Sequence, residues 1–495
     1  MTNRGAMAAA ENLLNQALGD HQVGRLDEAQ AAYEQVLALA ADALTNLATC
    51  HMQRGKLDEG LALIERSLAV RPGQLNALGN KAMALMAAGR FEAASAVCLQ
   101  ILAARPEDAD ALSMLGDALF QLDRPGEALD AYDRSLVLSF DILALNGRGA
   151  ALSALHRFDE AAETFDQAMA LSPDNARSAH HRAELNLRMG RLADGWKGYE
   201  ARWKGPLAAW NARLPRPVWR GETPVRGLTI LLLAEQGLGD SLQMVRYAPL
   251  LAAQGARVVL GAPAALAEIC RSVPGVAEVV VDGQPLPAFD ACCPMMSLPL
   301  AFGTTLETIP AQVPYLRAPP DKARIWKARL GASSKKRVGL VWSSGHRPDS
   351  PEQWAVNARR NIDLPKLRPL ARADVAFYSL QKGKPAEGEV GRLKAKGWGG
   401  PEIVDLANEL HDFADTAAVM EALDLIITVD TSTAHLAGAL SKPVWILTGY
   451  DACWRWMLER DDSPWYPTAR LFRQKAFNDW DPVIEDVVAA LQAFA

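Results

Sequence analysis

The sequence lacks the features by which membrane, secreted and nucleic-acid-binding proteins are usually identified. Its 495 residues contain no run of about 18 apolar residues, and the N-terminus has neither the basic start nor the apolar stretch of a signal peptide. The six cysteines include no CxxC pair, which argues against a zinc site or a disulfide framework. The formal net charge of -6 provides no basic field for nucleic acid. These absences predict a cytoplasmic protein without a transmembrane segment and without a nucleic-acid partner.

What the chain does contain is an ordinary globular composition and enough length for several domains. Hydrophobic residues make up 49% of the chain and charged residues 22%, as in folded globular proteins. With about 150 residues per domain as a guide, the length predicts about three domains.

The first 200 residues or so contain a tandem repeat. A turn motif such as GRLDEA or GKLDEG recurs every 31 to 34 residues, beginning at Gly24, Gly55, Gly89, Asp123, His156 and Gly190. Each unit pairs two helical segments, and several units end near a proline, at Pro72, Pro106 and Pro173. The period and the pattern resemble tetratricopeptide repeats over residues 8–204. Stacked helix pairs of this kind form an all-α superhelix whose concave surface holds a protein partner.

Asn46 and Asn80 occupy the same repeat position, nine residues before the turn glycine of their units. This face of the first helix lines the groove in such repeats, so both residues are candidates for gripping a peptide backbone. The later units place Met114, Gly147 and His181 at this position. That variation favours the alternative that the two asparagines are simply solvated, and binding by the superhelix as a whole is the stronger prediction.

A junction rich in proline and tryptophan follows the repeats at residues 205–227. Prolines interrupt the helical pattern there, Trp210 and Trp219 lie within the segment, and Trp203 lies just before it. Because tryptophan is too apolar for a loose linker, we expect these rings to seal the repeats against the next domain.

An α/β region begins at Leu228. GLTILLL predicts a strand, the following QGLGD a glycine loop, and SLQMVRYAPLL a helix before a second strand at ARVVLGA. In open parallel sheets the ligand lies beyond the carboxyl ends of the strands, which is where this loop stands. Gly237 and Gly239 would let the backbone approach a ligand closely, and Asp240 stands at the start of the helix.

Asp240 has two interpretations that position alone leaves evenly balanced. Aspartate is a preferred helix N-cap, and removing such a cap typically costs about 1 kcal/mol. The sharper hypothesis is a general base that points into a cleft. A nicotinamide site is disfavoured because the loop reads GLGDSL instead of GxGxxG, and the second strand ends at LGAP without an acidic residue for a ribose.

A second series of strands and helices follows a proline-rich stretch at residues 310–320. Strands are predicted in KKRVGLVWSS, VAFYSLQKG, EIVDL, LDLIITVD and PVWILTG, and a last helix in residues 481–495. Tyr450, Trp454 and Trp456 follow the last of these strands and are suited either to stacking on a base or sugar or to core packing.

The most informative segment is VDTSTAHLAGAL, which reads as an anion-binding turn. A buried strand ends at Asp430, and the chain then turns through Thr431, Ser432 and Thr433 into a helix that carries His435. Unsatisfied N–H groups at a helix start carry positive charge, so hydroxyls and a histidine beside them favour a phosphate. The alternative for His435 is a buried helix residue bonded to a backbone carbonyl.

From about Leu228 to Gln474 the chain resembles bacterial glycosyltransferases of the GT-B type, akin to the heptosyltransferase family (family 9). The resemblance rests on AEQGLGDSLQMVRYAPLL, DACCPMMSLPLAFGTTLETIP, VDTSTAHLAGALSKPVWIL and DSPWYPTARLFRQ. It implies an α/β GT-B domain of two Rossmann-like subdomains that face a cleft, behind the repeats. The subdomains would span residues 228–320 on the acceptor side and residues 335–475 on the nucleotide-sugar side.

The resemblance also implies roles for particular residues. Asp240 matches the family's proposed base, and the D-T-G-x-x-H turn that grips the nucleotide diphosphate matches Asp430, Thr431, Ser432 and His435, with serine in place of the glycine. Basic residues after the early strands of the second subdomain would neutralise the leaving phosphate, and the candidates are Arg360 and Lys382, with Gln381 beside them. An inverting transfer of this kind needs neither a metal nor a cofactor.

The combined architecture resembles that of flagellin glycosyltransferases, in which repeats bind flagellin and the sugar is a nonulosonic acid. It implies a glycosyltransferase that moves a sugar from a nucleotide sugar to a protein acceptor recruited by the repeats. A CMP-sugar donor would place one phosphate, not two, at the Asp430 turn. Two alternatives stay open: a transferase for lipopolysaccharide core sugars, and a catalytically inactive adaptor that binds proteins.

Overall fold

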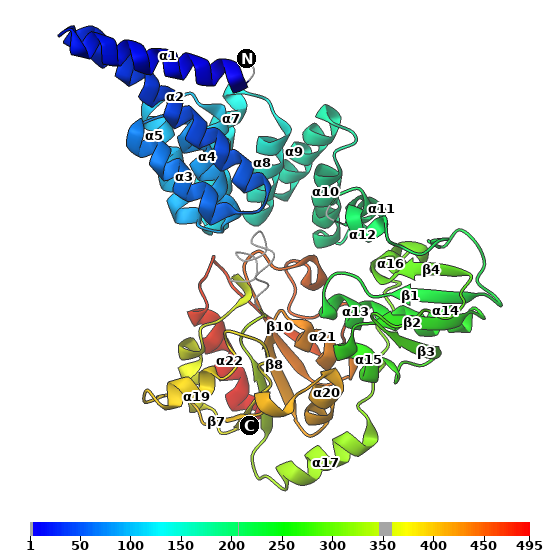
Figure 1. Cartoon of the computed structure of the whole chain (residues 1–495). Helices are drawn as coiled ribbons and strands as arrows, with labels where there is room; N and C mark the ends of the chain where they lie inside the picture. Colours follow the sequence, from blue (N-terminus) through cyan, green and yellow to red (C-terminus); the bar gives the residue numbers. More distant parts are fainter. Residues whose placement is uncertain (1–2, 206, 346–358) are drawn as a thin grey trace. The chain divides into compact units, whose positions relative to one another are not determined.

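Consecutive helices pack against one another through the first part of the chain (Figure 1). The computed structural model describes residues 3–205, 207–345 and 359–495. Their contacts divide them into two units, one that ends at Leu155 and one that begins at His156. The helices of the first unit are α1 (Asn3–Gln22), α2 (Leu26–Gln53), α3 (Leu57–Val70), α4 (Leu75–Ala87), α5 (Phe91–Ala104), α6 (Ala109–Gln121), α7 (Pro125–Leu138) and α8 (Ile142–Ala154).

The turns of the repeat share one backbone conformation. All six residues that begin the aligned turn motifs have a positive φ, between 59° and 79°, and they are Gly24, Gly55, Gly89, Asp123, His156 and Gly190. Glycine adopts this left-handed conformation without strain, and aspartate and histidine are among the residues enriched there. The predicted alignment of the turns is confirmed.

The first repeat departs from the predicted pair of separate helices. Helix α2 runs without interruption from Leu26 to Gln53, across the position where the later units turn. Those units turn near Pro72 and Pro106, whereas the corresponding stretch ALAADAL contains neither proline nor glycine. Without a residue that breaks the helix, two helical segments join into one.

The second unit begins with three more helices of the repeat and the tryptophan-rich junction. The helices are α9 (Phe158–Leu171), α10 (Ala176–Arg188) and α11 (Leu192–Tyr199), followed by η1 (Glu200–Trp203) and α12 (Ala208–Asn211). Trp203 is buried and stacks on Trp210, with ring centroids 5.4 Å apart. Trp196 and Trp219 belong to the same hydrophobic core as the strands that follow. The expectation that the predicted rings seal the repeats onto the next domain is therefore confirmed for Trp219, whereas Trp203 and Trp210 stack on each other within the junction.

The first sheet has four parallel strands in the order β3-β2-β1-β4. They are β1 (Thr229–Leu233), β2 (Arg257–Ala262), β3 (Val276–Val281) and β4 (Ala291–Pro294). Its helical segments are α13 (Leu238–Met244), η2 (Val245–Tyr247), α14 (Ala248–Ala253), α15 (Ala264–Cys270), η3 (Met295–Ser297) and α16 (Leu298–Ala301). The strand order reverses between β1 and β4.

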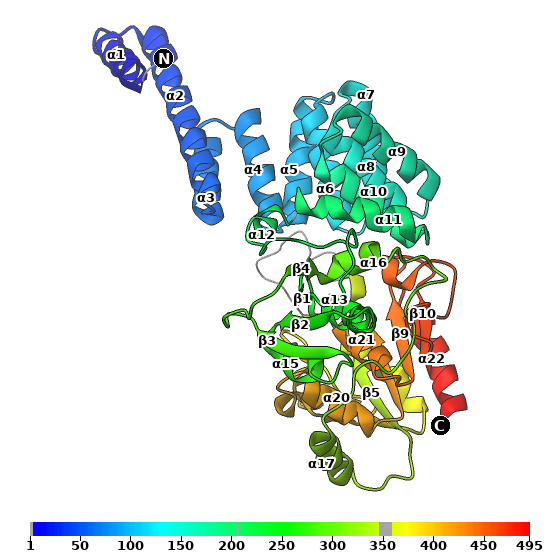
Figure 2. The same ribbon diagram turned by 90° about the vertical axis from the view of Figure 1, so that its right-hand side faces the viewer.

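The second sheet has six parallel strands in the order β10-β9-β8-β5-β6-β7, and Figure 2 shows it beside the first sheet. The strands are β5 (Arg337–Val341), β6 (Ala376–Ser379), β7 (Ile403–Asp405), β8 (Leu425–Val429), β9 (Val444–Thr448) and β10 (Ala469–Arg473). Numbered along the sequence, this is the doubly wound order 3-2-1-4-5-6, which reverses between β5 and β8.

Helices cover both faces of the second sheet and connect it to the first. They are α17 (Pro320–Leu330), η5 (Leu364–Arg372), α19 (Glu389–Lys394), η6 (Ala407–Glu409), α20 (Phe413–Glu421), α21 (Ser432–Ala439), η7 (Trp454–Trp456) and α22 (Asp481–Phe494). One hydrophobic core reaches from α10 and α11 through the first sheet to α20 and α21. A separate core lies between the second sheet, η5 and α22.

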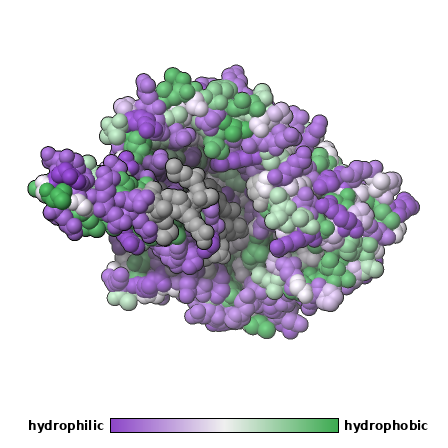
Figure 3. Space-filling view, turned by 45° about the horizontal axis from the view of Figure 1, so that its top comes forward, coloured by the Kyte–Doolittle hydropathy of each residue, from purple (hydrophilic) through white to green (hydrophobic). Residues whose placement is uncertain are grey.

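The helices of the described part of the chain include no candidate for a membrane-spanning segment. Among these helices, none combines the length and the apolar composition that a bilayer crossing requires. On the face drawn in Figure 3, hydrophilic residues predominate and hydrophobic ones are scattered among them.

Candidate functional site

Both segments singled out in the sequence follow strands at the reversal points of their sheets. The loop that carries Gly237, Gly239 and Asp240 follows β1, beside β4. The turn that begins at Asp430 follows β8, beside β5. Open parallel sheets bind their ligands beyond the carboxyl ends of the strands at such reversal points. The strand order thus places both segments where a ligand is expected.

Gly237 is the N-cap of α13, and Asp240 is the third residue of this helix, not its cap. The Oδ2 atom of Asp240 accepts the Gly237 N–H at 2.7 Å, as in a capping box. Asp240 therefore does stabilise the start of the helix, but as its third residue and not as the N-cap. This interaction uses one carboxylate oxygen and leaves the other for a different partner.

That partner is Arg455, which comes from η7 after β9 of the second sheet. Its guanidinium forms a salt bridge with Asp240 Oδ1 and donates from Nε to Gln243 Oε1 at 2.9 Å. The side chains of Arg455 and Asp240 are only 11% and 16% exposed. Burial alone would lower the pKa of Arg455, but Asp240 and the other acidic groups around it together raise this pKa. No spacing or motif in the sequence pointed to Arg455.

The Asp430 turn has the geometry expected of a helix start. Thr431 is the N-cap of α21, and its hydroxyl accepts the Thr433 N–H at 3.3 Å. Asp430 is 7% exposed, and its Oδ2 lies 3.5 Å from Nε of Arg360. Burial would raise the pKa of Asp430, but the donors around it, Arg360 foremost, together hold this pKa below its ordinary value. One predicted cation, Arg360, thus lies beside the turn as an ion-pair partner.

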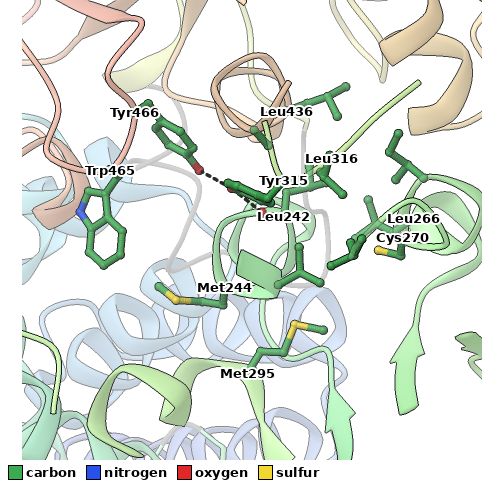
Figure 4. Close-up of a cluster of buried hydrophobic side chains, with 14 of the residues drawn as sticks. Leu242, Met244, Leu266, Cys270, Met295, Tyr315, Leu316, Leu436, Trp465 and Tyr466 are labelled. Atoms are coloured by element: carbon green, nitrogen blue, oxygen red, sulfur yellow. Dashed lines mark hydrogen bonds between the residues drawn. The ribbon is translucent and has the colours of Figure 1, made fainter. Parts of the chain in front are cut away.

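His435 is buried, at 3% exposure, and burial lowers its pKa to about 3. Its Nδ1 is 2.9 Å from the Tyr466 hydroxyl, and its ring stacks on Trp456 at 5.2 Å. The burial agrees with the alternative of a packed helix residue, although the partner is a hydroxyl and not the carbonyl expected. The hydroxyl oxygens of Tyr466 and Tyr315 lie 3.5 Å apart, within the cluster drawn in Figure 4.

The two segments meet at Gly239. A Cβ at this position would lie 2.8 Å from Cδ2 of His435 and 3.3 Å from Cα of Ser432. Position 239 thus requires glycine because its backbone lies close to the start of α21. Because Asp240 follows directly, it lies next to the contact between the start of α13 and the start of α21.

The remaining predicted binding residues lie at the same edge of the second sheet but have structural partners. Gln381 is buried, and among the described residues its side-chain amide bonds to the backbone of Trp342, Ser343 and Lys382. The Lys382 ammonium donates to Glu387 and to the Ala407 carbonyl. Gln381 therefore holds the ends of β5 and β6 together.

The three aromatic residues after β9 pack against protein groups. Tyr450 stacks on His156 with ring centroids 4.1 Å apart, and Trp454 meets Trp196 edge to face at 5.0 Å. Trp456 stacks on His435, as described above. The core-packing alternative accounts for all three, and it also ties the loop after β9 to the last helices of the repeat.

The two asparagines of the repeat lie in the first unit. Asn46 is exposed on α2, whereas Asn80 on α4 is half-buried and donates to the Thr49 hydroxyl at 3.0 Å. At the equivalent position of a later unit, Gly147 faces the buried ring of Tyr132. The groove position is thus filled differently along the stack, and peptide binding at Asn46 and Asn80 stays a prediction.

Comparison with protein families identifies the helical part of the chain. Family models described as tetratricopeptide repeat match residues 14–74, 80–139 and 142–175. These residues form tetratricopeptide repeats. The matched segments end before the two parallel sheets, which these family models leave undescribed.

Individual relatives share different amounts of the chain. Protein FlbA of Caulobacter vibrioides is 28% identical over 456 residues, which cover 86% of this chain and 74% of that protein. Two solved repeat structures each cover about a third of this chain. TTC0263, a thermophilic TPR protein of Thermus thermophilus, is 23% identical over 35% of this chain and 96% of its own, with a TM-score of 0.32. The TPR protein YrrB is 20% identical over 34% of this chain and 91% of its own, with a TM-score of 0.28.

Proposed function

We propose that the protein is a glycosyltransferase of the GT-B type that moves a sugar from a nucleotide sugar to a protein acceptor. The observation that carries the proposal is the meeting of two helix starts, one from each parallel sheet, at Gly239 and Ser432. One side supplies a carboxylate, Asp240, and the other supplies a turn of hydroxyls with Arg360 beside it. Sugar transfer from a nucleotide needs a base for the acceptor hydroxyl and a positively charged site for the leaving phosphate. Asp240 and the turn beside Arg360 would supply these two parts.

In the proposed reaction Asp240 takes the proton of the acceptor hydroxyl. The hydroxyl oxygen forms a bond to the anomeric carbon, and the bond from that carbon to the phosphate breaks with its electron pair on the phosphate oxygen. The first turn of α21 and the nearby guanidinium groups would stabilise the charge on the leaving phosphate. In this scheme no metal ion and no cofactor take part.

The tetratricopeptide repeats support a protein as the acceptor. Such repeats form extended concave surfaces that bind polypeptides, whereas a lipopolysaccharide acceptor would give them no function. We extend the proposal to flagellin as acceptor and a CMP-linked nonulosonic acid as donor, because the repeat-plus-transferase architecture resembles flagellin glycosyltransferases. The 28% identity to Protein FlbA over most of both chains is compatible with a shared architecture.

The donor site is tested by measuring the thermal stability of the full chain with CMP, UDP, GDP and ADP and with their sugar conjugates. A ligand that binds only the folded state raises the melting temperature by mass action. We expect one nucleotide class to stabilise the wild type and to stabilise Arg360→Gln much less, because the phosphate loses a neighbouring cation. The exposed Arg317 offers a matched control, and Arg317→Gln should respond as the wild type does. If no nucleotide shifts the wild type, the inactive adaptor becomes the better account.

A further inference from the structure

Arg455 links the two halves of the candidate site although it belongs to neither predicted motif. It lies in η7 of the second sheet and reaches Asp240 on α13 of the first sheet. Its guanidinium is held in place by the Gln243 side chain and by the Trp454 ring, whose centroid lies 4.1 Å away. Burying such a pair removes two charges from water, and this cost offsets much of their attraction, so the pair contributes little net stability.

The pair leaves Asp240 poorly suited to act as a base in the state that the structure shows. Arg455 holds Oδ1, and the Gly237 N–H holds Oδ2 at 2.7 Å. Both carboxylate oxygens therefore already accept a donor, and the Arg455 guanidinium occupies the side of Oδ1 where a proton would be received. Proton transfer to Asp240 therefore requires that the guanidinium of Arg455 leaves the carboxylate and pairs with another anion.

The donor phosphate is such an anion, and its proposed binding site is the turn that follows Asp430. Arg455 pairs with Asp240, and the next residue of η7, Trp456, stacks on His435 of α21. Asp430 also helps to raise the pKa of Arg455, so the guanidinium lies within electrostatic reach of the turn. A guanidinium fork pairs with a phosphate through two parallel hydrogen bonds. Two other cations of the site have their own partners, since Lys382 is tied to Glu387 and Arg360 to Asp430. Arg455 is the cation paired with the proposed base.

We propose that Arg455 exchanges Asp240 for the donor phosphate, so that binding of the nucleotide sugar releases the base. This inference rests on the proposed glycosyltransferase function and adds a residue and an order of events to it. Arg455 then neutralises the phosphate oxygen that receives the electron pair of the broken bond. Asp240, freed from its cation, takes the proton of the acceptor hydroxyl. Donor binding would thus come before activation of the acceptor.

The test uses the full chain and the nucleotide from CMP, UDP, GDP and ADP that binds the wild type. Arg455→Gln should weaken its binding about tenfold, the value of one charged hydrogen bond. It should also lower the transfer rate at saturating donor about 100-fold, as loss of one charge-stabilising donor does. Arg455→Lys keeps the positive charge but not the two-pronged guanidinium, so its affinity and its rate should lie between those of the wild type and Arg455→Gln. Millimolar guanidinium chloride should restore part of the Arg455→Gln rate, which a purely structural defect would not permit.

Asp240→Asn supplies a second and independent test by calorimetric titration. It removes the competing partner of Arg455, so the nucleotide should bind severalfold more tightly than to the wild type, although transfer is lost. Arg317 is exposed, and Arg317→Gln serves as the control and should leave both quantities unchanged. Unchanged nucleotide affinity in Arg455→Gln and in Asp240→Asn would overturn the exchange. If the wild type binds no nucleotide, the proposed function itself fails instead.

Discussion

At the scale of single residues, the site depends on one close approach. Gly239 lies against His435 and Ser432 because it has no Cβ. Gly239→Ala should therefore force the two helix starts apart and destabilise the second unit by about 1–3 kcal/mol, as overpacking typically does. The change is measured as a shift of the urea or thermal midpoint.

Gly391 supplies the matched control for that substitution. It lies in α19, and a Cβ there would meet nothing within 4 Å. Gly391→Ala should be neutral or slightly stabilising, because alanine restricts the unfolded chain. Equal destabilisation by the two substitutions would show that the Gly239 contact is not tight.

His435 gives stability a dependence on pH. Its folded pKa of about 3 lies below the value near 6.5 of an unfolded histidine, so the unfolded chain binds the proton more tightly. The contribution of His435 to stability is complete above pH 6.5. It is lost as the pH falls from there toward 3, at about 1.4 kcal/mol per pH unit.

His435→Gln should therefore show a smaller loss of stability between pH 7 and pH 5 than the wild type. The comparison uses the difference between the two pH values within each variant, so that the packing cost of the substitution cancels. The exposed His411 provides the control His411→Gln, which should behave as the wild type does. An identical pH dependence in His435→Gln and the wild type would contradict the buried neutral histidine.

The sequence located Asp240 and Asp430 because each follows a strand and opens a helix, a pattern that residues close in the chain determine. Arg455 could not be found in this way. Its role depends on a contact between η7 and α13, which lie more than 200 residues apart and are brought together only by the folded sheets. The same applies to the tie between His156 and Tyr450.

At the scale of elements, local signals predicted most of the strands and all of the repeat turns. β10 and α17 were not predicted. β10 reads ARLFR, in which two arginines mask a strand, and it follows a run rich in aromatic residues and proline. α17 carries five charged residues and a single buried aromatic ring, so its pattern resembled part of the proline-rich connection.

The boundary of the helical repeat is an element-scale result that can be tested by truncation. Helices α10 and α11 share a core with the first sheet, and Trp196 on α11 is 1% exposed. A chain that begins at His156 should therefore melt cooperatively. A chain that begins at Gly205, the boundary predicted from the sequence, should lose this core contact and aggregate.

Circular dichroism melts of the two truncated chains provide the measurement. The fragment from His156 should melt close to the last transition of the full chain. A fragment from Gly205 with the same melting temperature would show that α9 to α11 contribute nothing to the core.

At the scale of the whole molecule, the repeats and the two sheets are proposed to perform consecutive tasks. The repeats would select a polypeptide, and the sheets would hold the nucleotide sugar and carry out the transfer. Under this proposal the helical part, which matches tetratricopeptide-repeat models, and the sheets, which carry Asp240 and Asp430, have separate roles. It also predicts that acceptor selection and donor binding can be impaired separately.

The most direct measurement of the account is intact-mass spectrometry of a candidate acceptor, flagellin, incubated with the full chain and a nucleotide-sugar donor. The wild type should add the mass of one or more sugars, and Asp240→Asn should add none. An acceptor that stays unmodified with every donor that binds the wild type, or equal modification by Asp240→Asn, would contradict the account.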